Sequence, residues 1–233
     1  MLVTPDLLRT FSLFETLGTE DLNYLAQRSQ IERFARRAVI LNAGSQEDRV
    51  CFLFEGRLQG VDFTIDGREV GLYFVDPGDY CGELSVFDSG AQAEYVIALN
   101  SAVVVFVPVE ALREVADRQP VIMAGLGNKL AGRIRQMTLQ RSLLSLPNIT
   151  QRVCCQLWLL VPDETKDSQQ SAEIKDPPTH MEIAIMLNVS RETVTRVFQQ
   201  LQKRQIVSRD GPSKLLINDL QTIKEVAEGV KQL

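Results

Sequence analysis

Short apolar runs separated by glycines dominate the first half of the chain, and they predict a small antiparallel β-domain. The runs Val50–Phe54, Val61–Ile65 and Val70–Val75 lie between glycines that recur every 11 or 12 residues, and Asp66-Gly67 suits a hairpin turn. Short strands with turn signals at this spacing are typical of a sandwich or barrel. We therefore expect an antiparallel β-roll or jelly roll.

Helical periodicity appears before and after this β-rich region. Pro5–Arg28 is expected to form one or two short amphipathic helices. Gln119–Leu146 predicts one long helix, because Pro120 suits a first turn and apolar residues recur every three or four positions. This apolar stripe contains Ile122, Leu126, Leu130, Ile134 and Met137. The opposite, polar face contains Asn128, Lys129, Arg133, Arg135 and Gln136.

The length of this helix bears on how its apolar stripe is covered. A helix of about 25 residues spans roughly 37 Å at 1.5 Å per residue, more than a small domain core needs. The stripe is therefore expected to pair with a second copy of the chain in a coiled coil, with covering of the β-roll as the alternative. Leu126, Leu130, Ile134 and Met137 are the expected dimer residues.

The last third of the chain predicts a separate helical domain. An apolar helix, Ile149–Val161, is followed by a polar loop, Pro162–Pro178, and then by two helices and a hairpin. The chain is therefore expected to divide into residues 1–118, 119–146 and 147–233. The expected fold class is α+β, with an N-terminal β-roll, a long helix and a C-terminal winged helix-turn-helix.

Two short helices with clear end signals predict the helix-turn-helix. Thr179 and Glu182 form a capping box that begins the first helix. Asn188 tolerates the left-handed backbone that a sharp turn requires, and Ser190 caps the second helix. The apolar positions Ile183, Ala184, Leu187, Val189, Val194 and Val197 are expected to pack the two helices together.

The outward face of the second helix carries the side chains suited to DNA. Arg191, Glu192 and Arg196 lie where a recognition helix meets base edges in the major groove. Arginine can bond both guanine acceptors, and a carboxylate can accept from the cytosine amino group. A hairpin follows, in which Ile206-Val207 and Leu215–Ile217 flank the tip 209–212. The expected phosphate contacts are Thr179, Ser190, Thr195, Lys203, Arg204 and Arg209.

Composition and charge narrow the function further. The net charge is −5, but basic residues outnumber acidic ones in Pro177–Leu215, so a locally basic module is attached to an acidic carrier. The N-terminus lacks the features of a signal peptide, and the longest apolar runs are far shorter than a membrane span. We therefore expect a cytoplasmic protein. The four cysteines form no CxxC pair and are expected to be reduced thiols.

These motifs together resemble the CRP/FNR family of bacterial transcription regulators. The resemblance covers nearly the whole chain and is carried by the segments SRETVTRV, GDYCGELSVF and LFETLGTEDLNYLA. It implies a homodimer formed through the long helix, an effector-type β-roll, and reading of a palindromic GTGA-like site by Arg191, Glu192 and Arg196. It also implies a contact with RNA polymerase, for which the loop Pro162–Pro178 is a candidate.

The effector pocket is where the sequence departs from the family. In cyclic-AMP-binding members a GEL segment holds the ribose, and an Arg-Ser or Arg-Thr pair some ten residues later holds the phosphate. Here Gly82-Glu83-Leu84 is present, but Ala93-Glu94 occupies the second position. Losing a buried charged partner costs roughly 3–5 kcal/mol, so we expect weak or absent cyclic AMP binding in the usual mode. Met137 and Thr138 correspond to helix positions that face the pocket, and Glu83 is expected to cap the short helix after it.

Other readings stay open at this stage. The effector is unknown, and no cofactor or metal site is identified. The resemblance leaves cyclic di-GMP as an alternative to cyclic AMP, because family members that respond to cyclic di-GMP can carry a glutamate near the position of Glu94. A cupin-like metal enzyme is a further alternative, which the single histidine, His180, argues against because it lies outside the β-roll. A signalling module that no longer binds DNA is the third, and the intact recognition residues argue against it. We expect a DNA-binding regulator and not an enzyme.

Overall fold

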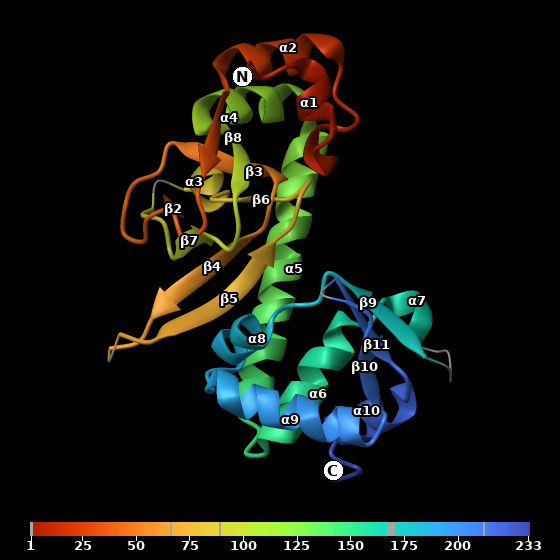
Figure 1. The fold of residues 1–233 in the computed structure, drawn as a ribbon. Helices are drawn as coiled ribbons and strands as arrows, with labels where there is room; N and C mark the ends of the chain where they lie inside the picture. Colours follow the sequence, from red (N-terminus) through yellow and green to blue (C-terminus); the bar gives the residue numbers. More distant parts are fainter. Residues whose placement is uncertain (1, 66, 89, 167–170, 212) are drawn as a thin grey trace. The chain divides into compact units, whose positions relative to one another are not determined.

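The two units of the chain meet within one helix. The computed structural model describes residues 2–65, 67–88, 90–166, 171–211 and 213–233 (Figure 1). One unit is Met1–Arg135 and the other is Gln136–Leu233. The long predicted helix is present as α5 (Pro120–Leu144), and its first part belongs to the first unit and its last part to the second.

The first unit is the predicted β-roll. Its strands are β1 (Gln30–Phe34), β2 (Val39–Leu41), β3 (Arg49–Glu55), β4 (Leu58–Phe63), β5 (Glu69–Val75), β6 (Tyr80–Cys81), β7 (Tyr95–Ala98) and β8 (Ala102–Pro108). They form two antiparallel sheets, ordered β1-β8-β3-β6 and β2-β7-β4-β5. Its other helices are α1 (Pro5–Arg9), the 3₁₀ helix η1 (Ser12–Phe14), α2 (Thr19–Arg28), α3 (Leu84–Phe87) and α4 (Val109–Arg118). Helices α1, α2 and α4 gather at one end of the roll (Figure 1).

Strand β8 explains why residues 102–107 are apolar without interruption. Val104 and Phe106 pack in the cluster between the two sheets. Val105 and Val107 point to the opposite face, where they pack against the N-terminal helices, α4 and the start of α5. A strand buried on both faces loses the usual alternation of apolar and polar residues. The first sheet therefore lies between the second sheet and a helical layer.

The apolar stripe of α5 is buried near the start of the helix and exposed further along it. Ile122 and Leu126 are fully buried in the helical layer of the first unit. By contrast, Ile134 and Met137 are 65% and 63% exposed. The assignment of Leu126 to a dimer surface is therefore wrong, because the roll already covers it, whereas Ile134 and Met137 stay candidates for pairing.

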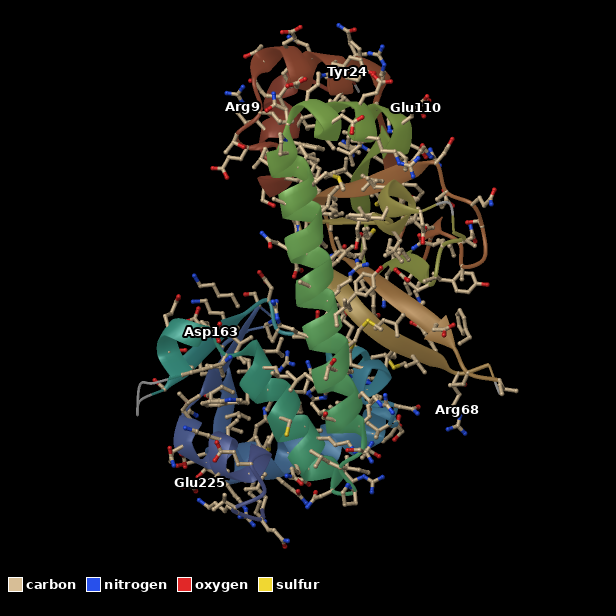
Figure 2. The ribbon with its side chains drawn as sticks, turned by 180° about the vertical axis from the view of Figure 1, so that it is seen from behind. Arg9, Tyr24, Arg68, Glu110, Asp163 and Glu225 are labelled. Carbon is tan, nitrogen blue, oxygen red and sulfur yellow. The ribbon has the colours of Figure 1, made fainter. Side chains whose placement is uncertain are left out.

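Turns in the roll depend on glycine at specific positions. Gly56, between β3 and β4, has a φ of +94°, and a Cβ built there would lie 2.4 Å from the carbonyl oxygen of Ser101. Gly67, in the β4–β5 hairpin, has a φ of +77°. Its predicted turn partner Asp66 lies outside the described residues. Figure 2 shows Arg68 at the tip of this hairpin.

The second unit contains the predicted helix-turn-helix and also helices and a strand before it and a hairpin and a helix after it. Its elements after α5 are α6 (Ile149–Leu160), α7 (Asp163–Lys166), β9 (Ala172–Lys175), α8 (His180–Leu187), α9 (Arg191–Lys203), β10 (Val207–Arg209), β11 (Lys214–Ile217) and α10 (Leu220–Ala227). The predicted hairpin is β10–β11, although Pro212 at its tip lies outside the described residues. Strand β9 pairs with β11 to make a three-stranded sheet ordered β10-β11-β9.

Two expectations for this unit were incomplete. The segment predicted as a polar loop, Pro162–Pro178, contains helix α7 and strand β9, whose Ala172 and Ile174 are buried in the core of the unit. The C-terminal helix α10 was not predicted. It packs against α6, and its Leu220, Ile223 and Val226 complete the same core.

Candidate functional site

The ends of α8 and α9 are fixed by the signals read from the sequence. The hydroxyl of Thr179 accepts from the backbone N–H of Glu182, and the Glu182 carboxylate accepts from the backbone N–H of Thr179. Asn188 has φ 50° and ψ 51°, which is the left-handed conformation expected of it. Ser190 then caps α9 by accepting from the backbone N–H of Thr193. The helix-turn-helix is therefore held by short-range hydrogen bonds in addition to its apolar contacts.

The predicted base-reading side chains share the exposed face of α9. Arg191, Glu192 and Arg196 are all exposed, whereas Val194 and Phe198 on the opposite face are buried. Glu192's own backbone N–H and the Ser190 hydroxyl hold the pKa of the Glu192 carboxyl below its usual range. The carboxylate is therefore ionised at neutral pH and accepts hydrogen bonds, as contact with a cytosine amino group requires.

Thr195 has internal partners that the sequence did not reveal. Its hydroxyl donates to the carbonyl of Arg191 at 2.9 Å and also lies 3.0 Å from Nδ1 of His180. The His180 ring packs on Phe198, with their centroids 4.4 Å apart. Burial lowers the pKa of His180, and the positive charges of Arg209 and Arg191 lower it further. The single histidine therefore lies between the two helices, close to two of the predicted DNA-contacting arginines.

The remaining predicted phosphate contacts are exposed. Thr179 and Ser190 present their side chains at the N-termini of α8 and α9, where both also serve as caps. Lys203, Arg204 and Arg209 are exposed at the end of α9 and on β10. Helix N-termini and basic side chains are the groups that bind backbone phosphates.

A buried ionic cluster occupies the part of the roll where the effector residues were expected. Nη1 of Arg133, on α5, lies 2.9 Å from Oε1 of Glu83 and 3.8 Å from Oε1 of Glu94. The Tyr73 hydroxyl donates to Oε1 of Glu94, and Nε2 of Gln92 donates to the same oxygen at 3.3 Å. The guanidinium carbon of Arg133 lies 3.8 Å from the centroid of the Tyr73 ring. Both carboxylates are therefore shared with groups of the chain itself.

The pKa shifts in this cluster follow from burial and charge. Burial raises the pKa of Glu83, although Arg133 opposes the change. Burial by itself would lower the pKa of Arg133, but Tyr73, Glu83 and Glu94 raise it overall, so the guanidinium stays charged. Burial is also the main reason why the pKa of Tyr73 is raised well above its ordinary value, and the phenol is neutral at neutral pH.

Several expectations for the effector pocket need correction. Arg133 and Lys129 were assigned to the polar face of α5, and this part of the face is covered by the roll: Arg133 is only 13% exposed, and Lys129 pairs with Asp79. Glu83 precedes α3 but makes no side-chain capping hydrogen bond, because its carboxylate faces Arg133 instead.

The other predicted pocket residues lie outside this cluster's buried core. Ala93 is exposed and Leu84 is half-buried. Met137 and Thr138 are exposed and belong to the second unit. Of the predicted pocket residues, only Glu83 and Glu94 contribute to the buried cluster. Arg133 also belongs to the cluster, but it was not among the predicted pocket residues.

Comparison with known proteins finds a match for each of the two domains. A cyclic nucleotide-binding domain model matches residues 31–119, and a Crp-like helix-turn-helix domain model matches residues 151–226. The CRP-like cAMP-activated global transcriptional regulator of Mycobacterium tuberculosis is 27% identical over 212 residues, which cover 91% of this chain and 94% of the relative. The Cyclic AMP receptor protein of Thermus thermophilus is 25% identical over 218 residues, which cover 94% and 97%.

A solved structure shows the same fold. FixK2 from Bradyrhizobium japonicum superposes with a TM-score of 0.71 at 20% identity, over 85% of this chain and 96% of FixK2. The class of protein is thus a transcription regulator with a cyclic-nucleotide-binding-type β-roll and a DNA-binding helix-turn-helix. The chain belongs to the CRP/FNR family, which confirms the resemblance read from its sequence.

The described part of the chain was also searched for metal-binding groups, membrane-spanning helices and disulfides. Within it, His, Cys, Asp and Glu nowhere gather in a group of three or more that could hold a metal ion. None of the helices described there has the length and apolar character to cross a membrane. All four cysteines are described, and all are free thiols.

Proposed function

We propose that this regulator binds a palindromic, GTGA-like DNA site as a homodimer and does so without cyclic AMP. The observation that carries the proposal is the buried pairing of Arg133 with Glu83 and Glu94 in the roll. A cyclic phosphate entering there would meet two carboxylates and a guanidinium that is already paired. Placing an anion in such a site without a free cation is unfavourable.

The DNA-binding part of the proposal rests on α9. Arg191, Glu192 and Arg196 lie on one exposed face at the N-terminal half of the helix, where base edges are read in this type of motif. The dimer rests on α5, whose Ile134 and Met137 are large apolar side chains left exposed in the single chain. A two-fold dimer would place two copies of α9 on half-sites about one helical turn apart. Contact with RNA polymerase is part of the same proposal and follows from the family alone.

Fluorescence anisotropy of a labelled palindromic duplex with TGTGA half-sites tests the proposal. The full-length protein is titrated at a fixed salt concentration, because phosphate contacts make affinity depend on salt. The titration is repeated with cyclic AMP and with cyclic di-GMP, and against a duplex with scrambled half-sites. We expect specific binding without nucleotide and no change when either is added.

Each other outcome of that titration has a definite meaning. Binding that appears only with cyclic AMP would overturn the proposal that the roll does not take up this nucleotide. Binding that needs cyclic di-GMP would identify the alternative effector. Equal affinity for the scrambled duplex would reject the GTGA-like site. The Arg191→Ala/Arg196→Ala variant should lose the preference for the palindrome, and sedimentation at the same protein concentration checks the dimer.

A further inference from the structure

The part of the roll that faces Arg133 has the chemistry of a receptor for a planar cation. Glu83 and Glu94 supply two buried carboxylates, and Tyr73 supplies a buried aromatic face. Carboxylates match the hydrogen-bonding fork of a guanidinium, and the aromatic face attracts its positive charge. We call Tyr73, Glu83 and Glu94 the guanidinium seat. All three residues come from the roll, and their combined charge excludes an anion.

The seat is occupied by a side chain of α5. Nη1 of Arg133 contacts both carboxylates, at 2.9 Å from Glu83 and 3.8 Å from Glu94, while its guanidinium carbon lies over Tyr73. Two other groups hold Glu94 in place, since Tyr73 and Gln92 both donate to Oε1. The carboxylate of Glu94 is therefore positioned by the roll, and the cation is supplied by helix α5.

The hydrogen-bonding capacity of this buried cluster is not fully used. In the described residues, Nη2 of Arg133 and both carboxylate oxygens of Glu83 are buried without a hydrogen-bond partner. Buried polar atoms left without partners are costly, so they mark a place where the chain alone does not satisfy its hydrogen bonds. An occupant held mainly through one nitrogen can be exchanged for another of the same chemistry.

We propose that this is a guanidinium-binding site for which Arg133 is the built-in occupant. In this arrangement Arg133 links the roll to α5 from within the chain. Arg133 lies close to Arg135, where the first unit ends, and α5 continues without a break to Leu144 in the second unit. Occupancy of the seat therefore fixes the helix at the point where it leaves the roll. This inference rests on the proposed nucleotide-independent DNA binding.

Chemical rescue of Arg133→Ala tests the proposal. The variant leaves two buried carboxylates without their cation, so it should melt at a lower temperature than the wild type. We also expect specific DNA affinity to fall by at least about fivefold, the lower end of typical coupling between sites. Millimolar methylguanidinium chloride should restore both properties by occupying the seat. Tetramethylammonium chloride at the same concentration should restore neither, because it has no hydrogen-bond donors.

Two controls separate the seat from general effects of charge. Arg135→Ala removes an equal charge from an exposed position on the same helix. It should melt like the wild type and should not respond to methylguanidinium chloride. Should Arg133→Ala fail to fold, Arg133→Ala/Glu94→Gln carries the same test, because it buries one carboxylate fewer and keeps Glu83 for methylguanidinium. Rescue of this double variant should again be specific to the guanidinium salt.

The outcomes distinguish this inference from the proposed function. An Arg133→Ala variant that melts and binds DNA like the wild type, or that responds equally to the two salts, would overturn the guanidinium seat. If the wild type shows no specific DNA binding without nucleotide, the proposed function fails. Guanidinium-specific recovery of melting would still support the seat in that case.

Discussion

Nδ1 of His180 donates a hydrogen bond to Oγ1 of Thr195 at 3.0 Å. The direction follows from the second bond of Thr195, whose single hydroxyl proton goes to the carbonyl of Arg191 at 2.9 Å. Nε2 of His180 therefore carries a lone pair, and it is buried with no hydrogen-bond partner among the described residues. Protonation of Nε2 would create a buried, unpaired donor close to Arg191 and Arg209.

Acid should therefore destabilise the second unit through His180. The pKa of this imidazole is lowered by burial and by the two arginines, so the unfolded chain takes up a proton at a higher pH than the folded chain. Stability is fully present above the ordinary histidine pKa of about 6.5 and is lost as the pH falls towards the lowered value. We expect the free energy of unfolding to fall between about pH 7.5 and pH 5.5 more steeply in the wild type than in His180→Gln.

Trp158 makes this prediction measurable, because the only tryptophan of the chain packs on the core of the second unit. Urea unfolding followed by its fluorescence at several pH values gives the two slopes. Other titrating groups are common to both proteins and cancel in the difference. Parallel curves for the wild type and His180→Gln would contradict the prediction.

The capping box of α8 should contribute measurably to stability. The Thr179 hydroxyl accepts from the Glu182 backbone N–H at 3.2 Å, and Thr179→Ala removes that acceptor. We expect a loss of about 1 kcal/mol in the free energy of unfolding, while Thr179→Ser should retain most of the stability because serine caps equally well. Urea unfolding monitored by Trp158 measures both variants. Equal losses for alanine and serine would show that the hydroxyl is not responsible.

Gly56 should tolerate substitution far less than Gly44. Both glycines have positive φ, +94° and +79°, so alanine at either position meets a backbone cost of roughly 1–2 kcal/mol. Only at Gly56 would the new Cβ also collide with backbone, 2.4 Å from the Ser101 carbonyl oxygen, whereas the space at Gly44 is open. We expect Gly56→Ala to cost about 1–3 kcal/mol more than Gly44→Ala. Thermal unfolding followed by circular dichroism compares them, and equal melting temperatures would contradict the clash.

Features with short-range signals were predicted from the sequence, and features that depend on distant contacts were not. The caps Thr179 and Ser190 and the turn at Asn188 are set by residues within four positions, so their pattern was sufficient. Arg133 is different, because its partners Glu83 and Glu94 lie on distant segments of the roll. Helical periodicity placed it with the polar residues of α5, and periodicity alone cannot distinguish a solvated arginine from a buried, paired one.

Strand β9 and helix α10 of the second unit were both missed, but for different reasons. Strand β9 has only four residues, and the alternation of Ala172 and Ile174 with polar neighbours was masked by the polar segments around it. Helix α10 had a usable signal, since Asp219 accepts from the backbone N–H of Thr222 as an N-cap and Leu220, Ile223 and Val226 recur at helical spacing. A systematic search for caps in the last residues of the chain would have found this helix.

The two kinds of predicted DNA contact should separate in their dependence on sequence and salt. Arg196, on the exposed face of α9, is assigned to base edges, and Arg209, on β10, is assigned to phosphate. We expect Arg196→Ala to weaken binding to the palindrome by about 1–3 kcal/mol and to relax the preference at one base position. Arg209→Ala should weaken binding to specific and scrambled duplexes alike and reduce the salt slope by about 1 per subunit. Anisotropy titrations at several salt concentrations, on both duplexes, measure these effects. A loss of sequence preference in Arg209→Ala, or a uniform loss in Arg196→Ala, would reverse the two assignments.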